Sequence, residues 1–203
     1  FAGMTAACLV GATQMAKAQS VEDFYRGKSI NLIVGFSVGG GYDLYARHLA
    51  RHMGKHIPGK PTVVTQNMAG AGSLRAANFI YTAAPKDGTA FGTFSRTTGI
   101  NPLLESGATF DGTKFTWLGS PTQVEQLIYI RADSPYKTID DVRKAAVPPK
   151  CGSTGTSSTG YYIGNLLEET VGAKFNTLTG YKDGPEVELA VERGEVLCRG
   201  ISV

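Results

Sequence analysis

The chain has 203 residues, of which 42% are hydrophobic and 18% charged, a composition typical of globular proteins with one large or two small domains. Its formal net charge of +3 is too small and too dispersed for a nucleic-acid-binding surface, although it suits anionic ligands. Residues 1–18 read as the tail of a secretory signal, because an apolar stretch too short to span a bilayer is followed by Ala16-Lys17-Ala18. We therefore expect export by a cleaved signal peptide.

The cysteines predict one disulfide. If Cys8 leaves with the signal peptide, Cys151 and Cys198 remain as an even pair in a compartment where disulfides persist. Each lies in a predicted strand, and we expect the two strands to be neighbours with the Cα atoms roughly 4.4 to 6.8 Å apart. Two separate buried thiols are the alternative.

The first half of the sequence alternates strand and helix patterns. The continuous apolar run 30–36 predicts a strand buried on both faces, and residues 43–57 predict the helix that follows it. The expected core stripe of this helix, at four-residue spacing, comprises Tyr45, Leu49, Met53 and Ile57. The pattern continues with strand 62–67, helix 72–84 and strand 89–95.

A second set of elements has a similar pattern. It comprises strand 125–131, helix 138–146, strand 150–152, helix 157–171, strand 175–178, helix 185–193 and strand 195–203. This alternation predicts an α/β fold with mainly parallel sheets. We expect two lobes, residues 19–122 and 123–203, the second incomplete because the sequence closes inside a strand.

Four loops that follow strands are rich in Gly, Ser and Thr, namely residues 37–43, 67–73, 95–98 and 152–159. In parallel α/β sheets, ligands bind at the carboxyl ends of strands, where backbone N–H groups of the next helix meet an anion. Each loop alone is explained equally well as a turn that the fold requires. Four loops divided between two lobes favour a cleft for one small anionic ligand.

The second of these loops imitates a dinucleotide-binding fingerprint. Gly70 and Gly72 have the required spacing, but Arg75 stands where the third glycine belongs, and the loop follows the second strand instead of the first. The sequence therefore does not favour a nucleotide, and we expect no cofactor.

Several short motifs occur one after another along residues 29–203, and their order and spacing carry a resemblance to a known family. They are Val34-Gly35-Phe36 with Gly39-Gly40, Asp43 with Ala46-Arg47, Val63-Val64 through Asn67 with Gly70-Ala71-Gly72, Ala84-Pro85 with Asp87-Gly88, Asn101-Pro102-Leu103, Gly152-Ser153 with Gly155, Tyr181-Lys182, and Gly194-Glu195-Val196. In these motifs the sequence resembles the tripartite tricarboxylate transporter substrate-binding family, also called Bug or TctC-like receptors.

This resemblance implies a two-lobed periplasmic-binding-protein fold of type II, the Venus flytrap, in a periplasmic protein that is not an enzyme. It also implies a small organic carboxylate as ligand and the membrane subunits of a tripartite transporter as partners. The ligand-binding residues carried over from the family are Ser37, Gly39, Gly40, Asp43, Ser95, Arg96, Gly155, Thr156 and Ser157. Among these, we expect Arg96 to make the main charged contact, because a guanidinium holds a carboxylate through two hydrogen bonds.

Three other functions compete with this interpretation. His48, His52 and His56 share one helical face that could bind a metal, but basic residues alternate with them, so we expect a solvated face and no metal. A serine hydrolase using residues 153–158 is disfavoured, because the cluster does not match G-x-S-x-G and no base is evident. A receptor that feeds a two-component sensor would use the same cleft.

Overall fold

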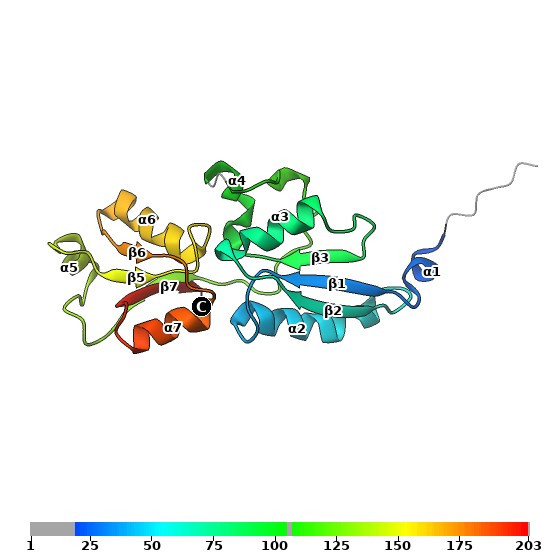
Figure 1. Cartoon of the computed structure of the whole chain (residues 1–203), viewed down its shortest axis with the longest axis horizontal. Coiled ribbons are helices and arrows are strands. Elements are labelled where there is room, and N and C mark those ends of the chain that lie inside the picture. Colours follow the sequence, from blue (N-terminus) through cyan, green and yellow to red (C-terminus); the bar gives the residue numbers. More distant parts are fainter. Residues whose placement is uncertain (1–18, 105–106, 203) are drawn as a thin grey trace, which may run out of the picture.

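The computed structural model describes residues 19–104 and 107–202, and the expected signal-peptide tail, residues 1–18, lies outside the described residues. Two sheets lie side by side along the long axis of the molecule, each with helices on both faces (Figure 1). We call the part around the first sheet the first lobe and the part around the second sheet the second lobe. The boundary expected between residues 122 and 123 falls in the stretch between the two sheets.

The first sheet is parallel throughout. Strand β1 (Ser29–Val34) lies between β2 (Thr62–Asn67) and β3 (Ala90–Thr93), giving the order β2-β1-β3. The apolar run of β1 is buried on both faces, as the sequence predicts. Helix α2 (Gly41–Met53) covers one face and α3 (Leu74–Thr82) the other (Figure 1). The carboxyl ends of these three strands all point toward the second lobe.

The face that α2 presents to this sheet differs from the predicted one. Tyr45 is 55% exposed and Leu49 39% exposed, whereas Ala46 is buried against Leu32 and Val34. The prediction of the core stripe was therefore wrong at its first two positions. The small side chain of Ala46 lets the helix backbone lie close to the strands, and the larger residues turn to the side.

The second sheet is mixed and has the order β4-β7-β5-β6. Strand β5 (Lys150–Gly152) runs parallel to β6 (Asn176–Leu178) and to β7 (Cys198–Ser202), while β4 (Gln126–Ile130) pairs with β7 in the antiparallel direction. Helices α6 (Thr159–Val171) and α7 (Gly184–Glu192) cover opposite faces (Figure 1). The predicted α/β class with mainly parallel pairing is confirmed.

Short elements complete the described chain. The α-helical ones are α1 (Val21–Tyr25), α4 (Asn101–Leu104) and α5 (Ile139–Arg143). The 3₁₀ turns are η1 (Gly54–His56), η2 (Ala71–Ser73), η3 (Arg96–Gly99) and η4 (Gly112–Lys114). None of the helices in the described ranges is both long and apolar enough to cross a membrane.

A disulfide joins Cys151 and Cys198, which confirms the predicted pairing. The two residues are direct partners in the parallel pair of β5 and β7, with the Cα atoms 4.3 Å apart, just below the expected range. Both are buried, at 4% and 0% exposure. The bond therefore links two strands within the second lobe and does not cross between the lobes.

Candidate ligand-binding site

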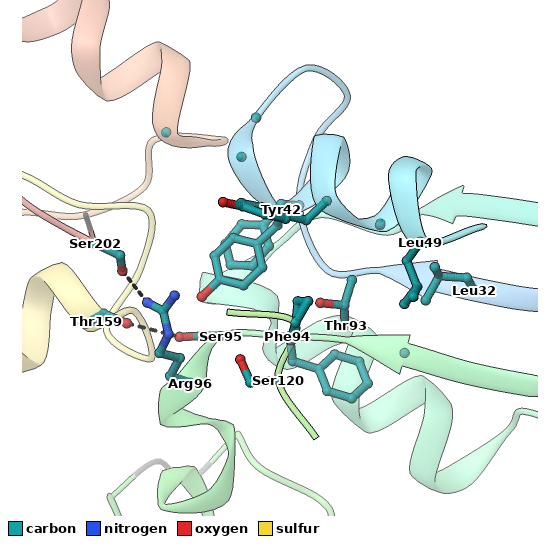
Figure 2. Close-up of a pocket in the computed structure, with 18 of the residues that line it drawn as sticks. Leu32, Tyr42, Leu49, Thr93, Phe94, Ser95, Arg96, Ser120, Thr159 and Ser202 are labelled. Atoms are coloured by element: carbon teal, nitrogen blue, oxygen red, sulfur yellow. Dashed lines mark hydrogen bonds between the residues drawn. The ribbon is translucent and has the colours of Figure 1, made fainter. Parts of the chain in front are cut away.

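A large cavity of about 2170 Å³ opens where the two lobes face each other. At one end of the cavity, which we call the polar end, the lining comes from loops of both lobes and includes Ser95, Arg96, Ser153 and Thr159. The carboxyl ends of β1, β3 and β5 all meet there. Figure 2 shows this end, with Tyr42, Ser95 and Arg96 of the first lobe opposite Thr159 and Ser202 of the second. The cavity also continues along the apolar side of the first sheet.

The first loop brings Ser37, Gly39 and Gly40 to the cavity wall. Gly39 has φ +91, a left-handed conformation that favours glycine, and its N–H donates to Asp43 Oδ2 at 2.9 Å. In this conformation the Gly39 N–H is therefore used within the protein. The first-turn N–H groups of α2, which starts at Gly41, have no partner inside the helix and are the backbone donors suited to an anion.

Asp43 does not line the cavity, and the structure gives it a different place from the one that the resemblance implies. Its side chain is 1% exposed and accepts hydrogen bonds from Gly39, from Arg47 Nε at 2.8 Å and from Asn67 Nδ2 at 2.7 Å. Asn67 also donates to the Phe36 carbonyl. Asp43 thus ties the first loop to β2 and fixes the shape of the loop.

The same contacts decide the charge of Asp43. Burial by itself would raise the pKa of this carboxyl, but the hydrogen bonds from Arg47, Gly39 and Asn67, together with the positive charge of Arg47, lower the pKa to about 2. Asp43 is therefore ionised throughout the physiological pH range.

We expect Asp43→Asn to lower the free energy of unfolding by about 1 to 3 kcal/mol near neutral pH, because it removes an ion pair and weakens the hold on the loop. A folded-state pKa below the unfolded value of about 3.9 stabilises the protein above that value, and the effect is lost as the pH falls toward 2. Denaturant titrations at pH 6 and pH 3 should show the difference between the two proteins shrinking. Asp140→Asn, which removes an exposed ion pair with Arg143, is the control and should change little. A difference that does not vary with pH would contradict this role.

The third loop places Ser95 and Arg96 at the cavity. Ser95 is buried and caps η3 by accepting the Thr97 N–H, while its own N–H donates to Ser73 Oγ at 2.7 Å. Arg96 is the first residue of η3, and its guanidinium extends across to the second lobe, where Nη1 donates to Ser202 Oγ (Figure 2). The rigid attachment of Ser95 thus aims Arg96 across the cleft.

The fourth loop reaches the cavity through residues next to the expected ones. Ser153, Thr154, Ser158 and Thr159 line the cavity, whereas Gly155, Thr156 and Ser157 do not. The reason is that α6 begins at Thr159, two residues later than predicted, with Ser158 as its extended N-cap. Ser158 Oγ bonds to Ser153 Oγ and to the Gly155 carbonyl, so this loop is held by its own hydroxyls.

Residues 155–157 instead hold the two lobes together. A Cβ on Gly155 would lie 3.0 Å from the Gly72 nitrogen, and one on Gly72 would lie 2.8 Å from the Ser158 nitrogen. Thr97 Oγ1 also donates to the Ser157 carbonyl at 2.6 Å. The glycine-rich second loop, which imitates a nucleotide-binding fingerprint, therefore packs directly against the second lobe.

Sequence reasoning missed a charged group on the second-lobe wall of the cavity. Arg199 of β7 forms an ion pair with Glu188 of α7 and donates to the Gly184 carbonyl at 3.0 Å. Tyr129 donates to Glu188, and burial together with the hydrogen bond and negative charge of Glu188 raises the pKa of Tyr129 to about 12. The arginine beside the buried Cys198 in the predicted final strand was the signal that could have pointed to a charged group here.

The three histidines are exposed on the outer side of α2 and η1, and none of them lines the cavity. In the described ranges no group of three or more His, Cys, Asp or Glu side chains could hold a metal ion. The hydroxyls of Ser153 and Ser158 therefore have no imidazole base among the residues around the cavity.

The fold and the cleft define a class, and comparison with solved structures shows which one. The chain matches the periplasmic binding protein BugD with a TM-score of 0.71 at 22% identity, over 88% of this chain and 60% of BugD. It matches MatC from Rhodopseudomonas palustris with bound malate with a TM-score of 0.75 at 22% identity, over 87% of this chain and 60% of MatC. A third match, R. palustris Rpa4515 with adipate, has a TM-score of 0.69 at 19% identity and similar coverage. The structure is thus a partial two-lobed periplasmic-binding-protein fold.

The sequence comparisons identify the family. Residues 45–203 match the tripartite tricarboxylate transporter family receptors, and the chain belongs to this family. A protein of Agrobacterium vitis described as "UPF0065 protein in the TAR-I ttuE-ttuC' intergenic region" is 31% identical over 206 residues, which cover 95% of this chain. The chain spans 56% of that relative and about 60% of the solved structures. The family of transporter receptors and the fold expected from the motifs are confirmed.

Proposed function

We propose that this protein captures a small organic carboxylate in the cleft between its lobes, as the solute-binding receptor of a tripartite tricarboxylate-type transporter. The observation that carries the proposal is the setting of Arg96. Its guanidinium crosses the cleft to Ser202, and no carboxylate of the described residues forms an ion pair with it. Arg47 and Arg199, by contrast, are each paired with a carboxylate. A cation without a counter-charge at the cleft suits an anionic ligand.

The hydroxyls around Arg96 support the same ligand chemistry. Ser95, Thr159 and Ser202 surround the guanidinium from both lobes (Figure 2). The buried Ser37 Oγ in the first loop has no hydrogen-bond partner in the described part of the chain, although it belongs to the cavity wall. Buried hydroxyls normally have a partner, and a ligand carboxylate with its ordered water would supply one.

The family supports a proposal for the location and the partner. One solved structure of this fold, BugD, is named a periplasmic binding protein, and two others contain adipate and malate. A buried disulfide is a feature of proteins that mature in an oxidising compartment such as the periplasm. We therefore place the protein in the periplasm, with the membrane subunits of a tripartite transporter as its partners.

A thermal-shift screen tests the proposal. The protein is heated with mono-, di- and tricarboxylates, aromatic acids and amino acids, each beside its primary amide as an uncharged control of the same shape. An acid present at 100 times its Kd adds about 2.7 kcal/mol to the free energy of unfolding, and its amide should add far less. Stabilisation by none of the acids, or equal stabilisation by acid and amide, would refute it. Chemical conversion of a stabilising acid would favour an enzyme instead.

A further inference from the structure

Tyr42 is an aromatic residue at the polar end of the cleft whose role the resemblance does not assign. It is the second residue of α2, and its ring stacks on Phe36, with ring centroids 4.2 Å apart and planes 17° apart. Both rings belong to the cavity wall, and Tyr42 lies beside Ser95 and Arg96 (Figure 2). Because Phe36 follows β1 and Arg96 follows the neighbouring strand β3, the Tyr42 side chain bridges the first and third loops.

The hydroxyl of Tyr42 has a specific neighbour. The Arg96 backbone N–H and guanidinium lie near enough to influence the Tyr42 hydroxyl electrostatically. Burial raises the pKa of Tyr42, and the nearby Arg96 charge and N–H only partly offset this, so the phenol is neutral and protonated near neutral pH. A neutral phenol has an O–H to donate, and a carboxylate held by Arg96 would lie next to the Tyr42 hydroxyl, because the two side chains are neighbours at the cavity wall (Figure 2).

We propose that Tyr42 contacts the ligand directly and selects carboxylates whose body next to the carboxylate is flat and uncharged, of the benzoate kind. The proposal rests on the proposed function, because it needs the carboxylate at Arg96. A carboxylate shared by Arg96 and the Tyr42 hydroxyl directs the adjoining carbons along the aromatic wall formed by Tyr42 and Phe36. A planar ring fits such a wall by offset or edge contact.

The charges of the cleft favour one carboxylate over two. Arg199 on the opposite wall is neutralised by Glu188, and Lys114 faces Asp111 at 3.8 Å. Among the described residues at the polar end, Arg96 therefore supplies the positive charge that is not already paired. An ammonium group beside the ligand carboxylate would lie close to Arg96 and be repelled, which disfavours α-amino acids.

Calorimetric titration with benzoate and cyclohexanecarboxylate tests this inference, because the two acids share ring size and charge but only benzoate is flat. The wild-type protein should bind benzoate about 2- to 10-fold more tightly, the range for an aromatic contact. Tyr42→Leu should abolish this preference. Tyr42→Phe should keep the preference while weakening both acids about 10-fold, because it removes only the hydroxyl.

Tyr136→Phe is the matched control, since its hydroxyl bonds to the Val147 carbonyl away from the cavity, and both affinities should stay at the wild-type values. Equal wild-type affinities for the two acids, or a benzoate preference that survives in Tyr42→Leu, would overturn the role of Tyr42 while leaving the proposed function intact. Failure of every carboxylate to bind the wild-type protein would instead remove the proposed function itself. If Tyr42→Leu does not fold, the benzoate preference of the wild-type protein and the weaker binding of both acids by Tyr42→Phe still test the role of Tyr42.

Discussion

Arg96→Ala is expected to weaken carboxylate binding by about 2 to 5 kcal/mol, at least about 30-fold in Kd, the range for truncating one member of a buried charged pair. The Arg96 side chain is exposed and spans the cleft to Ser202, so a bound acid would lie against it between the lobes and shield the charged pair from water. Removing it leaves the carboxylate desolvated with only hydroxyls and backbone N–H groups. Titration calorimetry with the acid that gives the largest thermal shift measures the loss.

Two further variants make the Arg96 test specific. Arg96→Lys should also bind poorly, because an ammonium cannot reproduce the planar fork of donors. Arg51→Ala removes the same charge from an exposed position of α2 outside the cavity and should leave the affinity unchanged. An Arg96→Ala protein that binds as tightly as the wild type would leave the backbone amides of the first loop as the anion site.

Replacing both Cys151 and Cys198 by Ala should lower the free energy of unfolding by about 4 kcal/mol. The disulfide closes a loop across a sequence separation of 47 residues, and the chain-entropy estimate for such a loop gives this value. The measurement is denaturant unfolding of both proteins under non-reducing conditions, and the wild type with reductant should approach the double variant.

Carboxylate affinity provides the control for the disulfide. Because the bond joins neighbouring strands of one sheet, a folded double variant should bind with nearly the wild-type Kd. A stability loss below about 1 kcal/mol would show that the unfolded chain is compact without the bond. A large loss of affinity in a folded variant would mean that the bond shapes the cleft.

The fold could be predicted because its strands carry their own signal. Strands β1, β2 and β4 coincide with apolar or β-branched runs, and the glycine-rich breaks between runs indicate the alternation with helices. The buried face of α2 could not be read in this way. Its buried residues are Asp43 and Ala46. The buried carboxylate is tolerated because Gly39, Arg47 and Asn67 all donate to it, and Asn67 lies 24 residues away in the sequence.

The site could be predicted in part. Ser37, Ser95 and Arg96 follow strands and reach the cavity as expected. The fourth loop was placed two residues off because helix starts depend on which residue takes the extended cap, and several hydroxyl residues there could cap α6 equally well. The ion pairing of Arg199 with Glu188 could not be predicted, because only the packing of α7 on β7 brings the two side chains together.

The contact between Gly72 and Gly155 has a consequence for ligand size. Backbone atoms meet there with no room for a methyl group, so chain atoms limit how closely the lobes can approach at that edge of the cleft. The closest approach of the two lobes at this edge is therefore set by backbone atoms, whatever acid is held. A short acid leaves space that bridging water must fill, while an acid too large for the space beside Arg96 and Ser202 forfeits the hydrogen bond between these two residues.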